Sequence, residues 1–152
     1  MATDVGLDER ITVILAAPPD ELCAHADAFA ADLLAIGEAT LERWIGARGG
    51  VPTRGEVEGF RLLALHRQGA AGEPSFNACR ETCRELVYHV NLIRFEPEHP
   101  SRAQRVRLAA MVARHLALFV DGKLEVEGLG EFCCAARPLR ATEVEAAAPA
   151  TS

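Results

Sequence analysis

The chain lacks most of the features that mark an enzyme or a membrane protein. Its 152 residues contain no G-x-S-x-G elbow, no P-loop and no G-x-G-x-x-G fingerprint. Neither a His-Glu-x-x-His motif nor a repeated Glu-x-x-His is present, which excludes the familiar zinc-protease and di-iron bundle patterns. No uncharged apolar run approaches the ~20 residues that a membrane span requires. We therefore predict no catalytic residue and no membrane partner.

Aromatic residues and lysine are also scarce. One Trp and one Tyr leave no stacking platform for single-stranded nucleic acid, and a net charge of −6 disfavours a polyanionic partner. The basic residues are almost all Arg, which we interpret as the coding bias of a GC-rich, bacterial genome. Nucleic acid is thus not an expected partner.

No secretory signal precedes the first apolar segment, because a basic n-region followed by an apolar h-region is missing. The five cysteines are an odd number, so a disulfide framework is not predicted. We expect a cytoplasmic protein with reduced thiols.

What the chain does contain is helical periodicity. The apolar spacing predicts a mainly α fold, a four-helix bundle-like single domain with a small C-terminal β-hairpin or extended segment. Thr53 and Glu56 have the spacing of a capping box and predict the start of the second helix. The predicted elements are an N-terminal lead-in over 1–17 (a short strand or an apolar segment packed on the bundle), helices near 20–47, 54–68, 75–95 and 101–120, a hairpin near 123–136, a domain over 18–140 and a disordered tail over 141–152.

The helix near 75–95 has the clearest apolar stripe, and the stripe contains two cysteines. Its members are spaced three and four residues apart and lie on one side of a helix: Phe76, Cys79, Cys83, Leu86, Val90 and Ile93. Core packing is the favoured interpretation of Cys79 and Cys83, since free cysteine is often fully buried.

The alternative interpretation is a metal, iron–sulfur or thiol-redox module. Cys79 and Cys83 would supply two thiolates to zinc or to an iron–sulfur cluster, with Cys133 and Cys134 supplying two more. His89 is a further candidate ligand on the edge of the stripe. The spacing of these cysteines matches no common zinc or cluster motif. The favoured interpretation predicts no cofactor.

Two polar groups remain as candidate sites. Tyr88, His89 and Asn91 form a polar cluster beside apolar residues and need hydrogen-bond partners or a ligand. Near the start of the fourth helix lies a possible anion patch of four cations: Arg94, Arg102, Arg105 and Arg107. Pairing with acidic residues of the first helix, Asp27, Asp32 and Glu38, accounts for these cations equally well.

The charge is distributed unevenly along the chain. Residues 1–60 carry a balance of −7, residues 61–120 carry +4 and residues 121–152 carry −3. Such a layout lets the halves attract each other or steers a partner. The leading hypothesis is a small helical interaction, accessory or regulatory protein without catalytic activity, whose partner is another protein or a second copy.

Overall fold

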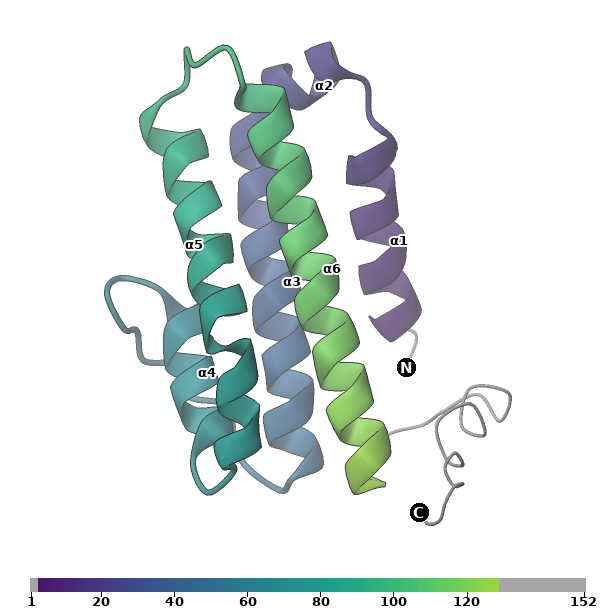
Figure 1. Ribbon diagram of the computed structural model, residues 1–152, viewed down its shortest axis with the longest axis vertical. Helices are drawn as coiled ribbons and strands as arrows, with labels where there is room; N and C mark the ends of the chain where they lie inside the picture. The colour runs from purple at the N-terminus through teal and green to yellow at the C-terminus, as the bar shows by residue number, and fades with distance from the viewer. Residues whose placement is uncertain (1–2, 129–152) are drawn as a thin grey trace. The chain divides into compact units, whose positions relative to one another are not determined.

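The computed structural model describes residues 3–128, with side chains from residue 6 onward. Its elements are α1 (Thr3–Ala16), α2 (Pro19–Ala24), α3 (Ala26–Ala47), α4 (Arg61–Ala70), the 3₁₀ helix η1 (Pro74–Cys79), α5 (Arg80–Phe95) and α6 (Arg102–Glu127) (Figure 1). Residues 3–128 contain no strand, so the prediction of a mainly α fold is confirmed. None of the helices in this range is long and apolar enough to cross a bilayer.

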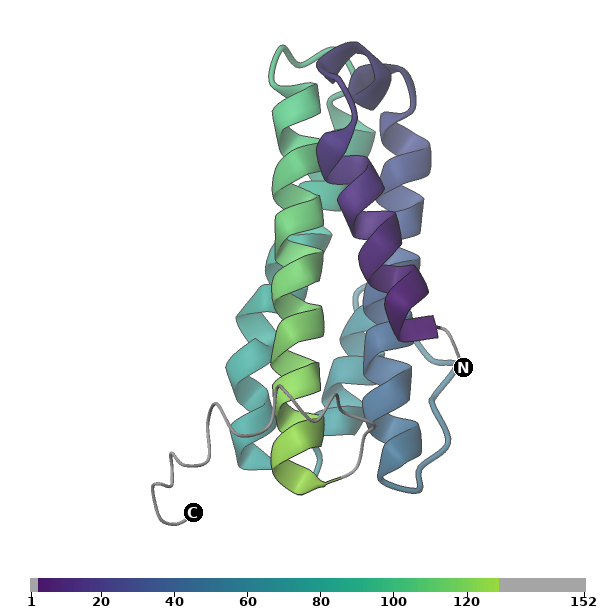
Figure 2. The ribbon, with the colours of Figure 1, turned by 90° about the vertical axis from the view of Figure 1, so that its right-hand side faces the viewer.

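The chain divides into two compact units, Met1–Val120 and Asp121–Ser152, and the packing described here is that of the first unit. Helix α3 is its centre, because α3 contacts α1, α2, α4 and α5. Figures 1 and 2 show α3 and α5 side by side and antiparallel, with α2 at one end. The largest buried side chains of α3 belong to Leu33, Ile36, Leu41 and Trp44, all fully buried.

The N-terminal segment is a helix and not the strand that its β-branched run suggested. Helix α1 covers Thr3–Ala16, and Leu7, Ile11 and Ile14 are buried. These three residues are spaced four and three apart, so a helix places them on one apolar face. Packing of that face against α3 outweighs the weak strand propensity of Ile11–Ile14.

The predicted helix over 20–47 is interrupted at His25. This residue ends α2 and precedes α3, with φ of −119° and ψ of 25°, outside the helical region. The His25 N–H still donates to the Glu21 carbonyl, and the Phe29 N–H donates to the His25 carbonyl. The break therefore costs few hydrogen bonds.

The prediction that Thr53 and Glu56 form a capping box at the start of the second helix is wrong, since α4 begins at Arg61. The Thr53 hydroxyl accepts from the Gly55 N–H at 3.0 Å, which closes a local turn. Glu58 and Gly59 then have φ of 55° and 84°, values incompatible with a right-handed helix. These residues form the two-residue turn of the bridge between Val57 and Phe60.

The cysteine-containing stripe is buried as its periodicity predicted. All six members have at most 1% of their surface exposed. Their backbone differs from a single helix, because η1 covers Pro74–Cys79 and α5 begins at Arg80. The 3₁₀ turn keeps Phe76 and Cys79 three residues apart on one side, which suits a helix of three residues per turn.

The predicted hairpin near 123–136 is wrong over its first half, because Lys123–Glu127 belongs to α6. Asp121-Gly122 suggested a turn, yet a helix tolerates an interior glycine at a cost of ~1 kcal/mol. Leu116, Val120 and Leu124 continue the four-residue spacing, which explains the longer helix. The second half of the hairpin and the predicted tail over 141–152 lie outside the described residues.

Candidate functional site

Four elements meet near the start of α5 and build the candidate site. The turn at Val57–Phe60, α4, η1 and the first turn of α5 are neighbours, and α4 contacts both η1 and α5. Trp44 of α3 forms part of the wall behind them, since its indole stacks on Phe76 at a centroid distance of 4.8 Å. The site therefore lies on a rigid aromatic support.

Phe76 organises that support. His66 of α4 stacks on the other side of the Phe76 ring at 5.7 Å, and Phe119 of α6 packs against it at 5.6 Å. The Trp44 indole N–H donates to the Gly69 carbonyl at 3.0 Å. A Cβ at Gly69 would lie 3.0 Å from Trp44 and 3.1 Å from Phe76, so only glycine allows α4 to approach this closely.

The two thiols of the stripe lie under this aromatic wall. The Cys79 thiol donates to the Phe76 carbonyl at 3.2 Å, and His66 Nε2 lies 3.2 Å from the same oxygen. A hydrogen bond from the Cys83 thiol is the main cause that lowers the pKa of Cys79 to about 6, with His66 adding to it and burial opposing it. The same hydrogen bond and burial raise the pKa of Cys83. Of the two thiols, Cys79 is therefore the one whose ionisation the surroundings favour.

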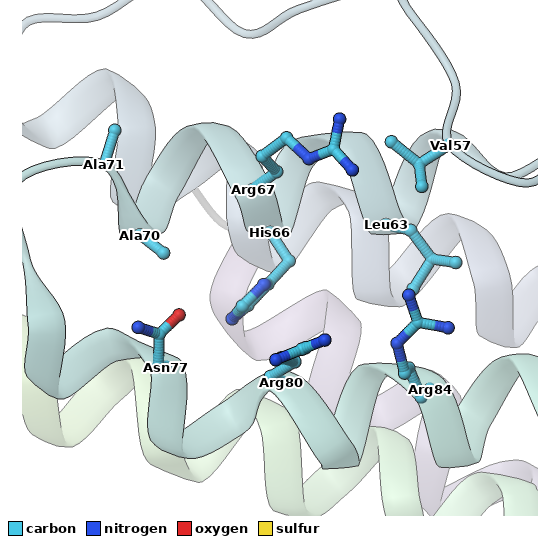
Figure 3. Close-up of a pocket in the computed structure, with 9 residues that line it drawn as sticks. All are labelled: Val57, Leu63, His66, Arg67, Ala70, Ala71, Asn77, Arg80 and Arg84. Carbon is cyan, nitrogen blue, oxygen red and sulfur yellow. The ribbon is translucent and has the colours of Figure 1, made fainter.

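A cavity of about 270 Å³ opens between α4 and α5, and we call it the arginine pocket. Its polar lining consists of His66, Arg67, Asn77, Arg80 and Arg84, and its apolar wall of Val57, Leu63, Ala70 and Ala71. Figure 3 shows Arg80 and Arg84 projecting from α5 toward α4, while His66 projects from α4 toward α5. Guanidinium and imidazole groups from two helices therefore converge on one cavity.

The charges around the arginine pocket are not balanced. Arg84 donates two hydrogen bonds to the Glu58 carboxylate, at 3.0 and 3.2 Å. The Arg84 hydrogen bond is the main cause that lowers the pKa of Glu58, and the charge of Arg67 adds to it. Across residues 3–128, neither Arg67 nor Arg80 has an acidic partner within salt-bridge distance. Arg67 and Arg80 are therefore the two cations of the pocket that form no ion pair with a described residue.

The sequence-predicted metal site is only partly within the described structure. Cys79 and Cys83 are adjacent and buried, whereas Cys133 and Cys134 lie outside the described residues. No group of three or more His, Cys, Asp or Glu residues suited to a metal ion occurs in the part of the chain that the structure describes. A site shared by all four cysteines stays a prediction.

Two members of the predicted polar cluster are in contact, because the rings of Tyr88 and His89 meet edge to face with their centroids 5.5 Å apart. Tyr88 is 59% exposed, whereas His89 is buried. His89 Nε2 lies 3.6 Å from the Glu85 carboxylate, and its buried Nδ1 makes no hydrogen bond to any described residue. Asn91 is half-buried. The three side chains of this cluster therefore differ in burial, although the rings of Tyr88 and His89 touch.

The predicted anion patch consists largely of cations with intramolecular partners. Arg102 is buried and donates to the Ile93 carbonyl and to Asp27 of α3. Arg105 pairs with Glu96 at 2.8 Å. These contacts favour the alternative interpretation, in which the arginines pair with acidic residues of the same chain, as Arg102 does with Asp27.

The remaining members of both groups follow the same pattern. Arg107 donates to the Ala17 carbonyl at 3.2 Å, and Arg94 is exposed. Asp32 lies 3.5 Å from Arg10, and Glu38 lies 3.4 Å from Arg61. Most of these charges thus bind neighbouring helices of the same chain.

Sequence reasoning missed the arginine pocket. Along the sequence, Arg80 and Arg84 have the i,i+3 and i,i+4 spacing to Glu81 and Glu85 that is typical of ion pairs on an exposed helix face. The structure instead pairs Arg84 with Glu58, which is 26 residues away. The one available signal was the excess of Arg over acidic residues in 61–120.

Comparison with known proteins adds no further assignment. No protein-family model, no curated protein and no solved structure matches the chain. The function must therefore be argued from the geometry of the site.

Proposed function

We propose that this protein is a small helical interaction protein that binds an anionic group of a partner in the arginine pocket and catalyses no reaction itself. One observation carries the proposal: Arg67 and Arg80 line a cavity and have no acidic partner within salt-bridge distance among residues 3–128. Guanidinium groups bind carboxylate and phosphate oxygens through paired, charge-assisted hydrogen bonds. An anionic partner would satisfy donors that the fold leaves available.

The surroundings of His66 support a binding role over a catalytic one. His66 Nε2 lies at hydrogen-bond distance from the Phe76 carbonyl, and its ring stacks on the Phe76 ring. A general base needs a ring nitrogen free to reach a substrate proton. Its packing makes His66 a rigid wall of the pocket.

The scaffold belongs to the same proposal. We infer that α3, α4, α5 and α6 act as a four-helix bundle-like frame that holds the two faces of the pocket. The buried stripe of α5 and the central position of α3 support this inference. A cytoplasmic location also belongs here, supported by Cys23, Cys79 and Cys83, which are free thiols.

Titration of ¹⁵N-labelled protein with a capped acidic dipeptide, acetyl-Glu-Glu-amide, tests the proposal. We expect saturable amide shift changes confined to α4, η1 and the first turns of α5, because the carboxylates would contact Arg67 and Arg80. The variant Arg94→Gln serves as the matched control, because Arg94 lies on α5 like Arg80 but outside the pocket. This variant should show the same shift changes on titration as the wild type. Shift changes scattered over the whole surface, or none, would contradict the proposal.

A second candidate function is thiol oxidation at the pair Cys79 and Cys83. The carrying observation is that Cys79 and Cys83 lie four residues apart in the buried stripe, where the pKa of Cys79 is lowered to about 6, which favours the reactive thiolate. Residues four apart on a helix have Cα atoms about 6 Å apart, within the range of disulfides. With hydrogen peroxide as oxidant, the Cys79 thiolate would give a sulfenic acid and hydroxide, and the Cys83 thiol would then form the disulfide and release water.

Peroxide treatment followed by peptide mass mapping tests this candidate. We expect loss of two hydrogen atoms from the peptide that contains both cysteines. The variant Cys83→Ala should stop at the sulfenic acid, which dimedone captures. Exposed Cys23 is the internal comparison, and faster oxidation of Cys23 than of the pair would contradict the candidate.

A further inference from the structure

We infer that the arginine pocket recognises a phosphate monoester in its dianionic form in preference to a carboxylate. This inference rests on the proposed function and adds the chemical class of the ligand. The ligand can be a free small ester or a phosphorylated side chain of a partner, and both present the same phosphoryl group.

The first argument is charge. The pocket gathers the cations of Arg67, Arg80 and Arg84. Glu58 pairs with Arg84, and the charge of Glu81 also acts on Arg84, so Arg67 and Arg80 are the two cations of the pocket without an acidic partner within salt-bridge distance among residues 3–128. A phosphate monoester carries a charge of about −1.5 to −2 at pH 7, whereas a carboxylate carries one negative charge. A dianionic monoester matches the charge of these two cations, whereas a carboxylate matches only one of them.

The second argument is the direction of the donors. Arg80 and Arg84 are one helical turn apart on α5 and point toward α4, whereas the guanidinium of Arg67, which also lines the pocket, extends from α4 on the side away from α5 (Figure 3). The Asn77 side chain adds an amide at the η1 side. A tetrahedral phosphoryl group offers three acceptor oxygens that point in different directions. Donors on two helices therefore fit a phosphoryl group better than a planar carboxylate.

The third argument is size and lining. A volume of about 270 Å³ lies just below the roughly 300–1,000 Å³ of pockets for drug-sized ligands, so a small ligand fits. Val57, Leu63, Ala70 and Ala71 form an apolar wall beside the cations. Carbon atoms next to the ester oxygen would contact this wall, which favours a monoester over inorganic phosphate.

Isothermal titration of the full chain tests the inference with matched probes. The probes are glycerol 3-phosphate, acetyl-phosphoserine-methylamide, acetyl-Asp-methylamide, inorganic phosphate and glycerol 3-sulfate. We expect both phosphate monoesters to bind one to one and about tenfold or more tightly than the carboxylate. The sulfate ester has the same tetrahedral shape with one charge, and it should also bind about tenfold more weakly.

Variants place the binding in the pocket. Arg80→Gln and Arg67→Gln should each weaken monoester binding about tenfold or more, because each removes charge-assisted hydrogen bonds. Arg94→Gln should leave the affinity unchanged. Both pocket side chains are exposed, so circular dichroism should show unaltered folding in every variant.

Each outcome has a distinct meaning. Equal affinity for the carboxylate or the sulfate ester overturns the inference about the ligand and leaves the proposed anion pocket in place. Failure of every anion to bind, or equal binding by Arg80→Gln and wild type, overturns both. Tighter binding of the phosphoserine probe than of glycerol 3-phosphate identifies a phosphorylated partner as the source, and the reverse identifies a free ester.

Discussion

Two groups of arginines differ in what the fold does with them. Arg102, Arg105 and Arg107, at the start of α6, bind carboxylates or carbonyls of the same chain. Arg67 and Arg80 line a cavity and have no acidic partner within salt-bridge distance among residues 3–128. The α6 group is dense in the sequence, whereas the pocket group is assembled from two helices.

The difference teaches that local density of charge is a poor guide to a binding site. Arg102 is buried, and a buried cation is tolerated only when it is paired and hydrogen-bonded. Its donors are therefore committed to the fold. Arg80 is exposed at a cavity, so its guanidinium is open to solvent and needs no partner within the fold.

The largest expected effect on stability comes from removing a buried arginine at the start of α6. The change Arg102→Met removes the donor to the Ile93 carbonyl and the partner of Asp27, and should lower the free energy of unfolding by about 2–3 kcal/mol. Urea denaturation measures this loss. The control Arg94→Met on α5 should change stability by less than about 0.5 kcal/mol. Equal stability of the two variants would contradict the assignment of Arg102 to the core.

The next prediction concerns the close packing of α4 against Trp44 and Phe76, and it compares substitutions at two glycines. Gly69→Ala should destabilise the protein by about 1–3 kcal/mol, because the new methyl group meets Trp44 and Phe76 at 3.0 and 3.1 Å. Gly46→Ala in α3 meets no atom within 4 Å and should stabilise by about 0.5–1 kcal/mol. Thermal unfolding compares the two variants. A stabilising Gly69→Ala would show that the aromatic wall is not tightly packed.

The thiol pair makes the stability of the pocket region depend on pH. The pKa of Cys79 is about 6 in the folded protein, below the ordinary value near 9, so the unfolded chain binds more protons between these values. Stability should rise with pH in this window, by about 1 kcal/mol from pH 7 to 8, and be lost as pH falls through about 6.

Urea titrations between pH 6 and 8 measure this dependence. Cys79→Ala should flatten the slope, whereas Cys23→Ala should leave it unchanged. The raised pKa of Cys83 acts in the opposite direction only above the ordinary thiol pKa, outside this range. An equal slope in wild type and in Cys79→Ala would contradict the assignment of the thiolate to Cys79.

The smallest expected effect comes from releasing the one paired arginine of the pocket. Glu58→Gln frees Arg84 and should tighten binding of glycerol 3-phosphate about two- to threefold, since a third cation becomes available. Glu56→Gln, in the same loop, is the matched control. Isothermal titration at constant ionic strength measures both. Weaker binding by Glu58→Gln would mean that Glu58 orients Arg84 and does not compete with the ligand.

Much of the fold follows from periodicity, and most of the errors lie where local patterns were ambiguous. The six-residue stripe on η1 and α5 is buried throughout because spacings of three and four repeat over five intervals. Ile11–Ile14 and Lys123–Glu127 each offered only a few alternating residues, which fit a strand or a helix equally. Tertiary contacts decided α1, and the continued four-residue spacing extended α6.

The candidate site was beyond the reach of sequence reasoning for a different reason. Arg67 and Arg80 are separated by a loop and a 3₁₀ turn, and their approach depends on Gly69 fitting against Trp44 and Phe76. The partner of Arg84 lies on a two-residue turn where a helix was expected. Neither the approach of Arg67 to Arg80 nor the pairing of Arg84 with Glu58 produces a recognisable pattern of neighbouring residues in the sequence.

The amino-acid order alone thus determined that this chain is helical and that the two thiols of the stripe are shielded from water, because hydrophobic periodicity is a local property that burial then satisfies. Only the tertiary structure decided which cations bind carboxylates of their own chain and which remain available. That outcome depends on distances between side chains on different helices, and Coulomb attraction and desolvation are set by those distances.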